Sequence, residues 1–429
     1  MRVLLTVFAA KTHLFNLVPM AWALRSAGHE VLVASQPDLM DAVTRAGLTG
    51  VPVGDELRMG GGSGGGSGGP TAQTFQGMSG DLVWADERDA DWERLLGAFT
   101  VGCSVQYEFF AGGAMLDELV ELARDWRPDL VVWDALTFAG AIAARACGAA
   151  HARMLFGLDY VSRGYLRYRE LLRRQPPELW DDPVSDWLRG RLDRYGLGFA
   201  EPDALELMTG QWSIDPTPPG MQFPLGLRYV PVRQVPYNGP AAVPEWIHEP
   251  RTRPRVALSL GMSGRDLMGG DTIPVEWMLA GLADLDVELV ATLSAAQLAS
   301  VPTLPDRVRA VEFVPLNDLL PTCAAVVHHG GFGTVVNVLT HGVPNLTVPA
   351  PWWDEADLGR HIAERGAGLV VEPAALGPDS LRDGLARLLH EPAFAEGAAR
   401  VREELLAVPS PHDLVPAIEA LTAEHGTGR

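Results

Sequence analysis

The stretch AAVVHHGGFGTVVNVLTH, residues 324–341, joins three features in the order that a phosphate-binding α/β unit requires. An apolar run reads as a buried strand, paired glycines permit a tight turn, and residues 335–341 read as a helix. Backbone N–H groups at such a turn can approach an anion, and the dipole of the helix adds attraction. A histidine and Thr334 in the turn can donate hydrogen bonds to phosphate oxygens. A glycine-rich turn alone is a weak signal, but strand, turn and helix together predict a phosphate site.

The same alternation of strand and helix extends outward through the chain and predicts the α/β class with doubly wound parallel sheets. In the N-terminal part we expect strands at residues 2–8, 30–35, 130–133 and 152–156, and helices at residues 17–24, 116–125 and 138–147. In the C-terminal part we expect strands at residues 255–260, 287–292, 308–313 and 324–328.

The length of 429 residues indicates two domains, because single cores rarely exceed roughly 250–300 residues. Ten prolines crowd residues 216–254, which reads as an extended linker. We therefore predict two α/β domains with a cleft between them, a favoured place for ligands. The expected division is an N-terminal domain at 1–222, a Pro-rich linker at 223–253, a C-terminal domain at 254–408, and a C-terminal helix at 409–429 that packs back on the N-terminal domain.

Residues 60–69 read GGGSGGGSGG, a composition typical of flexible linkers. We interpret this repeat as an engineered linker, with a natural low-complexity loop as the alternative. It is not a phosphate loop, because no Lys-Ser/Thr pair follows it and no strand closely precedes it.

The composition disfavours several classes of partner and compartment. A formal net charge of −20 argues against nucleic acid and anionic membranes, which select clustered Lys and Arg. Cys103, Cys147 and Cys323 are far apart and show no metal-binding spacing, so we expect a reducing, cytoplasmic location. The apolar run after Arg2 is short, so we expect a buried first strand there rather than a signal peptide, and no uncharged apolar stretch reaches the length of a membrane span.

Several further stretches carry a resemblance to a known family. The glycine-rich turn, HGVP at 341–344 and Trp353-Asp354 are similar to the nucleotide-sugar site of the GT-B, family 1 glycosyltransferases. The chain also resembles the actinomycete macrolide and polyketide glycosyltransferases, closest to the desosaminyl-, mycaminosyl- and forosaminyl-type enzymes. The stretches that carry this second resemblance are THLFNLVPMAWALRSAGHEV (12–31), WRPDL (126–130), GQWSID (210–215), YNGP (237–240), VPEW (243–246) and FVP (313–315).

This resemblance implies a GT-B fold in which two Rossmann-like domains face a central cleft. It implies an inverting hexosyltransferase that moves a deoxysugar or aminosugar from a dTDP-sugar to a hydroxyl of a macrolide or polyketide aglycone in antibiotic biosynthesis. No metal or other cofactor is expected. Many members of the subgroup work with a cytochrome-P450-like auxiliary protein, and a homodimer is a further option.

The resemblance assigns the donor site residue by residue. By its spacing to Pro344, His329 rather than His328 matches the phosphate-binding histidine. Many family members hold the ribose with a glutamate eight residues after it, where this chain has Asn337. The other residues expected around the donor are Gly331, Gly333 and Thr334 at the diphosphate, the Val314 backbone at the thymine, Ser263 at a phosphate, and Trp353, Asp354 and Glu355 at the sugar. The second carboxylate, Glu355, would suit a cationic aminosugar. The alternative for Asp354 and Glu355 is a solvated helix N-terminus.

Inverting transfer needs a base that takes the proton of the acceptor hydroxyl, and histidine suits this role because its free pKa lies near 6.5. His13 follows the first strand, at the carboxyl edge where ligands collect in doubly wound sheets, and the resembling enzymes place their base there. Asp134 ends another strand at the same edge and is expected to orient His13. The alternative for Asp134 is a cap of the following helix.

The acceptor is expected near the same edge, against Trp133, Phe138, Phe156 and Tyr160. Ordinary core packing is the alternative for these aromatic residues. Two Asp-x-Asp strings, at 89–91 and 284–286, match the metal motif of other glycosyltransferases, but their positions favour solvated acids.

Two other functions remain open from the sequence. A nucleotide-sugar epimerase shares the fold, and a non-catalytic nucleotide-sugar binder or helper protein would lack a working base. A Rossmann dehydrogenase is a weak option, because residues 9–15 contain no glycine.

Overall fold

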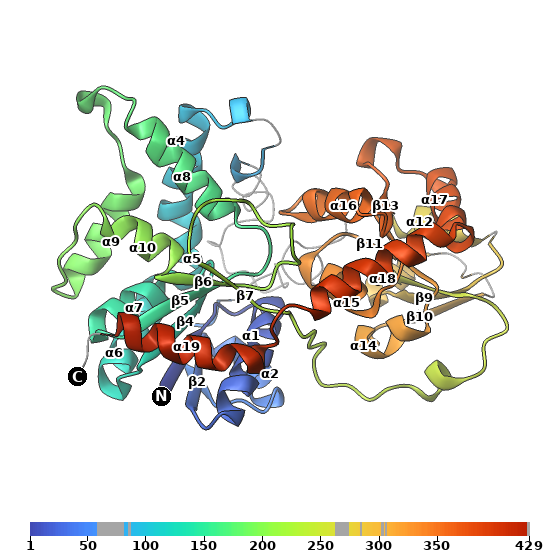
Figure 1. The fold of residues 1–429 in the computed structure, drawn as a ribbon, viewed down its shortest axis with the longest axis horizontal. Coiled ribbons are helices and arrows are strands. Elements are labelled where there is room, and N and C mark those ends of the chain that lie inside the picture. Colours follow the sequence, from blue (N-terminus) through green and yellow to red (C-terminus); the bar gives the residue numbers. More distant parts are fainter. Residues whose placement is uncertain are drawn as a thin grey trace. The chain divides into compact units, whose positions relative to one another are not determined.

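The computed structural model describes residues 1–57, 81–84, 87–261, 274–283, 285–301, 304 and 307–426. Ser263 and the Gly/Ser repeat at 60–69 lie outside the described residues. The chain forms two compact units (Figure 1). Unit 1 comprises Met1–Thr217, Gln222–Tyr237 and Pro409–Arg429, and unit 2 comprises Pro218–Met221 and Asn238–Val408.

Unit 1 is built on a seven-stranded parallel sheet in the order β3-β2-β1-β4-β5-β6-β7. Its central strands are buried on both faces, because helices cover both, as parallel sheets require. The strands are β1 Arg2–Thr6, β2 Glu30–Ser35, β3 Gly50–Pro52, β4 Leu130–Asp134, β5 Ala150–Met154, β6 Trp212–Asp215 and β7 Tyr229–Pro231.

The helices of unit 1 include one from the far end of the chain. α19 (Pro411–His425) packs beside α1 (Lys11–Ser26), and its Leu414 and Ile418 join the core of the sheet (Figure 1). The other helices are α2 Met40–Arg45, α4 Trp92–Val101, α5 Tyr107–Ala111, α6 Gly113–Trp126, α7 Ala139–Cys147, α8 Tyr160–Leu172, α9 Pro183–Arg194 and α10 Asp203–Thr209, with a π-helical turn at Gly102–Gln106.

Unit 2 is built on a six-stranded parallel sheet in the order β10-β9-β8-β11-β12-β13. The strands are β8 Arg255–Ser259, β9 Glu288–Thr292, β10 Val308–Val311, β11 Ala325–His328, β12 Asn345–Thr347 and β13 Gly368–Val370. The helices are α12 Val275–Ala283, α13 Ala295–Ser300, α14 Leu316–Leu319, α15 Phe332–His341, α16 Glu355–Glu364, α17 Pro378–His390 and α18 Pro392–Leu406.

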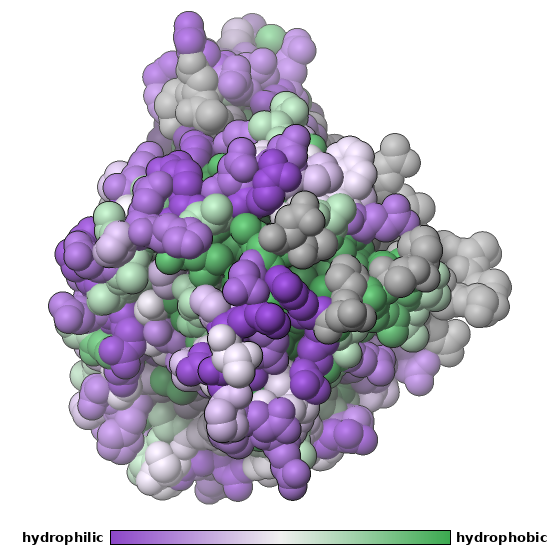
Figure 2. Space-filling view, turned by 90° about the vertical axis from the view of Figure 1, so that its right-hand side faces the viewer, coloured by the Kyte–Doolittle hydropathy of each residue, from purple (hydrophilic) through white to green (hydrophobic). Residues whose placement is uncertain are grey.

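The surface drawn in Figure 2 is mixed, with hydrophilic residues surrounding apolar ones. Exposed apolar side chains on unit 2 include Trp277, Leu298 and Phe313. Within the described ranges, no helix has both the length and the apolar character to cross a bilayer.

Both sheets confirm the doubly wound prediction and share one topology. In each, the first strand lies beside the fourth, so the strand order reverses between β1 and β4 in unit 1 and between β8 and β11 in unit 2. Open α/β sheets bind ligands outside the carboxyl ends of the strands at such a reversal. We therefore expect the ligand-binding residues of unit 1 after β1 and β4, and those of unit 2 after β8 and β11.

The predicted start of the first helix at residue 17 is wrong, because α1 already begins at Lys11. His13 therefore stands in the first turn of a helix, and Pro19 stands in the helix interior instead of its first turn. The N-cap, Ala10, offers no side-chain hydrogen bond, so no residue in the sequence marks the true start.

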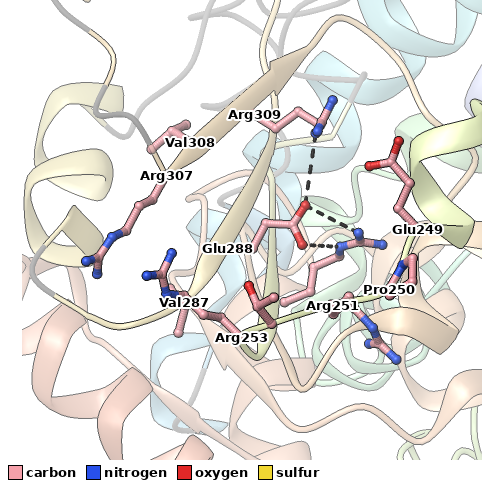
Figure 3. A pocket seen from close by; sticks show the side chains of 11 residues that line it. Glu249, Pro250, Arg251, Arg253, Val287, Glu288, Arg307, Val308 and Arg309 are labelled. Atoms are coloured by element: carbon pink, nitrogen blue, oxygen red, sulfur yellow. Dashed lines mark hydrogen bonds and ion pairs between the residues drawn. The ribbon is translucent and has the colours of Figure 1, made fainter.

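A hollow of about 460 Å³ lies at the opposite, amino edge of the unit 2 sheet (Figure 3). Carboxylates bridge the arginines that line it: Glu288 pairs with buried Arg255 and faces Arg309. Asp286 in the same way lies 2.6 Å from Arg253 and 3.2 Å from Arg307. These ion pairs tie the amino ends of β8, β9 and β10 together, away from the point of strand reversal.

Candidate active site

His13 and Asp134 meet at the strand reversal of unit 1. Nδ1 of His13 lies 2.7 Å from Oδ2 of Asp134, and the two side chains are 12% and 3% exposed. Asp134 ends β4, and its Oδ1 accepts hydrogen bonds from Leu136 N at 3.1 Å and from Thr137 Oγ1 at 3.4 Å. The carboxylate thus caps the turn that follows it and holds the histidine. A carboxylate only accepts, so Nδ1 carries a proton, and in the neutral form of the ring Nε2 is then an acceptor.

Two phenylalanines enclose the ring of His13. The Phe8 ring lies 4.6 Å from it and the Phe156 ring 4.4 Å, both tilted. Phe110 stacks on Phe8 at 4.3 Å. Together with the Asp134 bond, these contacts restrict rotation of the imidazole. The sequence analysis did not identify Phe8 or Phe110. Phe8 lies two residues after the end of β1 and could have been inferred, whereas Phe110 belongs to α5, far away in the chain.

Three of the four aromatic residues predicted at the acceptor lie in the core instead. Trp133, Phe138 and Tyr160 are at most 1% exposed. Trp133 precedes Asp134 in β4, and neighbouring residues of a strand point to opposite faces, so its indole packs under α7 while Asp134 reaches His13. Phe156, the fourth of these residues, contacts the ring of His13.

The two histidines of the glycine-rich turn have different surroundings. His328 ends β11, as predicted, and is fully buried. Its Nδ1 accepts from Gly330 N at 3.0 Å and its Nε2 lies 3.2 Å from Asn345 Oδ1. Burial lowers the pKa of His328 to about 3, so it is a neutral, structural residue.

The ring of His329 lies between two glycines at the strand reversal of unit 2. A Cβ on Gly261, after β8, would stand 2.4 Å from this ring, and a Cβ on Gly331 would stand 2.3 Å from it. Both positions therefore exclude larger residues while the ring keeps this place. Gly261 also has φ +74°, and its contact brings the loop after β8 against the motif after β11. Ser263 follows two residues later, outside the described residues.

The start of α16 packs on the same turn. A Cβ on Gly330 would meet the Cα and Cβ of Glu355 at 2.9–3.1 Å. Asp354 is the N-cap residue of α16 and is 2% exposed. Oε2 of Glu355 accepts from Trp353 N at 2.7 Å, and burial raises the pKa of Glu355 to about 7. Both residues therefore stand at the start of a helix, but they are buried, so the alternative of a solvated helix N-terminus is wrong.

The remaining predicted donor residues lie along α15 or before it. Thr334 stands in the first turn of α15, and its backbone N–H donates to Gly331 O at 2.9 Å. A Cβ on Gly333 would meet nothing within 4 Å. Asn337 is buried, with Nδ2 bonded to Gly333 O at 2.7 Å and Oδ1 accepting from Asn238 Nδ2 at 3.1 Å. The side chain of Val314 is in the apolar core.

The chain matches known proteins over nearly all its length. The N-terminal domain of the erythromycin biosynthesis protein CIII-like family matches residues 22–261, and the C-terminal domain of that family matches residues 276–421. The chain is 47% identical to the aclacinomycin-T 2-deoxy-L-fucose transferase of Streptomyces galilaeus, with 100% of this chain and 98% of that protein aligned. It is 45% identical to the 10-deoxymethynolide desosaminyltransferase of Streptomyces venezuelae, over 99% and 98% of the two chains. The crystal structure of glycosyltransferase VinC in complex with dTDP has a TM-score of 0.88 at 42% identity, covering 99% of this chain and 100% of that one.

Proposed function

This chain belongs to the erythromycin biosynthesis protein CIII-like family of GT-B glycosyltransferases, and from that premise we propose how its residues carry out the reaction. The enzyme transfers a deoxysugar from a dTDP-activated donor to a polyketide or macrolide aglycone in antibiotic biosynthesis. The hydrogen bond between His13 and Asp134 is the observation that carries the proposed mechanism.

His13 acts as the base. Its Nε2 takes the proton of the acceptor hydroxyl as the hydroxyl oxygen attacks the anomeric carbon, with inversion. Asp134 holds the tautomer in which Nε2 can accept, and it stabilises the imidazolium that forms. Phe156 supports the ring and offers an apolar surface to the acceptor.

The bond from the anomeric carbon to the diphosphate breaks as the new bond forms, and dTDP leaves with the electron pair. His329 and the N-terminus of α15, with Gly331, Gly333 and Thr334, stabilise the charge on the departing diphosphate. We assign no metal to this step, because the helix terminus and the histidine provide the stabilisation.

The sugar and nucleoside contacts complete the proposed donor site. Trp353, Asp354 and Glu355 contact the sugar, supported by the packing of α16 on Gly330. Since the pKa of Glu355 is raised by burial, a cationic aminosugar would draw it toward the carboxylate form, whereas a neutral deoxysugar would not. Val314 contacts the thymine through its backbone, Ser263 a phosphate, and Asn337 the ribose region.

We further propose that the enzyme is cytoplasmic and works with a P450-like auxiliary protein, as its subgroup resemblance implies. Three free cysteines support a reducing compartment. Leu179 and Trp180, exposed at 61% and 57% between α8 and α9, offer an apolar surface for such a partner or for a second copy of the chain. Co-purification after joint expression, compared with a Trp180→Ala variant, distinguishes a heteromeric from a homomeric assembly.

Calorimetry tests the donor assignment first. We expect micromolar binding of dTDP in the presence of EDTA, weaker binding of UDP, and loss of dTDP binding in His329→Ala. His13→Ala should keep dTDP affinity and lose transfer. Absence of dTDP binding to the wild type would contradict the donor site, and transfer by His13→Ala would contradict the base.

A further inference from the structure

We propose that the buried ion pair between Arg153 and Asp159 positions Phe156 against His13, so that both charged residues act as positioning residues for the transfer reaction. The inference rests on the proposed role of His13 as the base. It concerns the segment at residues 155–159, which connects β5 to α8 in unit 1 and contains Phe156.

The pair is almost completely shielded from solvent. The side chains of Arg153 and Asp159 are 0% and 2% exposed. Nη1 of Arg153 donates to Oδ1 of Asp159 at 3.1 Å and Nη2 donates to Oδ2, so the guanidinium binds both carboxylate oxygens. The Tyr229 hydroxyl donates to Oδ2 at 2.7 Å, and Ser162 N donates to Oδ1 at 3.1 Å. Four hydrogen bonds therefore fix the orientation of the Asp159 carboxylate.

The same network fixes the backbone on both sides of Phe156. Arg153 is anchored in β5 and donates to Ser213 Oγ of β6 at 3.0 and 3.2 Å. Asp159 N donates to Gln222 Oε1 at 3.0 Å, and the carbonyl of Gly157 accepts from Thr217 Oγ1 at 3.3 Å. The segment is held before, within and after the turn that presents Phe156, whose ring lies 4.4 Å from the ring of His13.

The contribution of this ion pair to the stability of the fold does not by itself explain its presence. Desolvation of two charges offsets most of their attraction, and apolar side chains of similar volume would stabilise a core as well. A bidentate guanidinium and carboxylate add a fixed geometry that apolar contacts lack. Here that geometry sets the place of the aromatic ring that limits the motion of the base.

A double-mutant cycle tests the inference. Tyr229→Phe and Asp159→Asn weaken the network, and Phe156→Ala removes the ring that it positions. We expect each change to lower kcat, by about tenfold to a hundredfold for Asp159→Asn, with the KM for the dTDP-sugar unchanged. In the Phe156→Ala background, the network changes should have almost no further effect on kcat.

Glu288→Gln is the matched control, because it removes the carboxylate partner of another buried arginine, Arg255, in unit 2. Any loss of kcat that Glu288→Gln causes should multiply with the loss of kcat that Phe156→Ala causes. Circular dichroism and dTDP calorimetry establish that each variant is folded. If Asp159→Asn does not fold, the Tyr229→Phe cycle, which keeps both charges, decides alone.

The outcomes separate the inference from the function on which it rests. If the losses of kcat from the network variants and from Phe156→Ala multiplied in the double variants, the positioning role would be overturned, while His13 would remain the base. If the His13→Ala variant transferred sugar at the wild-type rate, both the positioning role and the assignment of His13 as the base would be overturned. Coupled losses together with an inactive His13→Ala would support the inference.

Discussion

Nδ1 of His13 lies 2.7 Å from Oδ2 of Asp134, across the two strands at which the order of the unit 1 sheet reverses. β1 and β4 pair in parallel, with Thr6 opposite Trp133, so the residues that follow both strands emerge at one edge. The dyad is thus a direct product of strand order, and its two members are more than a hundred residues apart in the chain.

Asp134→Asn should lower kcat by at least about a hundredfold, because an amide can donate to Nδ1 and favour the tautomer in which Nε2 carries the proton. The KM for the dTDP-sugar should stay within twofold. Steady-state kinetics with separately varied donor and acceptor measure this. A loss of less than threefold would show that Asp134 serves only as the cap for residues 136–137.

Gly331→Ala should weaken dTDP binding by at least about tenfold, because its Cβ would stand 2.3 Å from the His329 ring and displace it. Gly190→Ala in α9 is the control: a Cβ there meets nothing within 4 Å, and we expect a gain of about 0.5–1 kcal/mol in stability. Calorimetric titration of both variants with dTDP makes the comparison. Equal affinities would mean that the His329 ring is not needed in its present place.

Glu355 should make the stability of the fold depend on pH in a defined direction. Burial raises its pKa from 4.5 to about 7, so between these values the folded chain binds more protons than the unfolded chain. Stability from this group is therefore present at low pH and lost as pH rises to about 7, by about 3 kcal/mol at most.

Glu355→Gln removes this dependence. Relative to the wild type, the variant should gain stability from pH 5 to pH 8, as followed by urea denaturation at both values. A difference in free energy of unfolding that stays constant across this range would contradict the shifted pKa.

Asn238→Ala should loosen α14, the single turn that contains Asn317. Oδ1 of Asn238 accepts from Asn317 N at 2.8 Å and its amide donates to Asn337, so the change leaves polar groups without partners, at about 1–3 kcal/mol. Hydrogen exchange at the Asn317 amide should accelerate. The Leu358 amide of α16, which donates to Asp354 O, is the internal control and should keep its rate.

The sequence predicted the features that depend on local pattern. Long apolar runs with β-branched residues gave the central strands β2, β4, β8 and β11 to within a residue or two. The strands β3, β7 and β13, of three residues each, have no such period and were not predicted. A strand this short owes its place to the neighbour with which it pairs.

The candidate site was predictable where a motif followed a strand, as with His13, Asp134 and His329. It was not predictable where a contact depended on distant segments. Trp133, Phe138 and Tyr160 were expected at the acceptor because aromatic residues near a sheet edge look alike in sequence whether they face the core or a ligand. The stacking of Phe110 on Phe8 joins residues separated by about a hundred positions, which no local pattern encodes.

The return of α19 to unit 1 determines how this enzyme can be recombined with its relatives. Val415 and Leu421 of α19 share a core with Leu17 and Leu24 of α1, the helix that begins beside His13. A chimaera that takes everything from Asn238 onward would put a foreign α19 against the native α1. A graft that begins at Asn238 and ends at Val408 would exchange most of unit 2 and keep the native contact between α1 and α19.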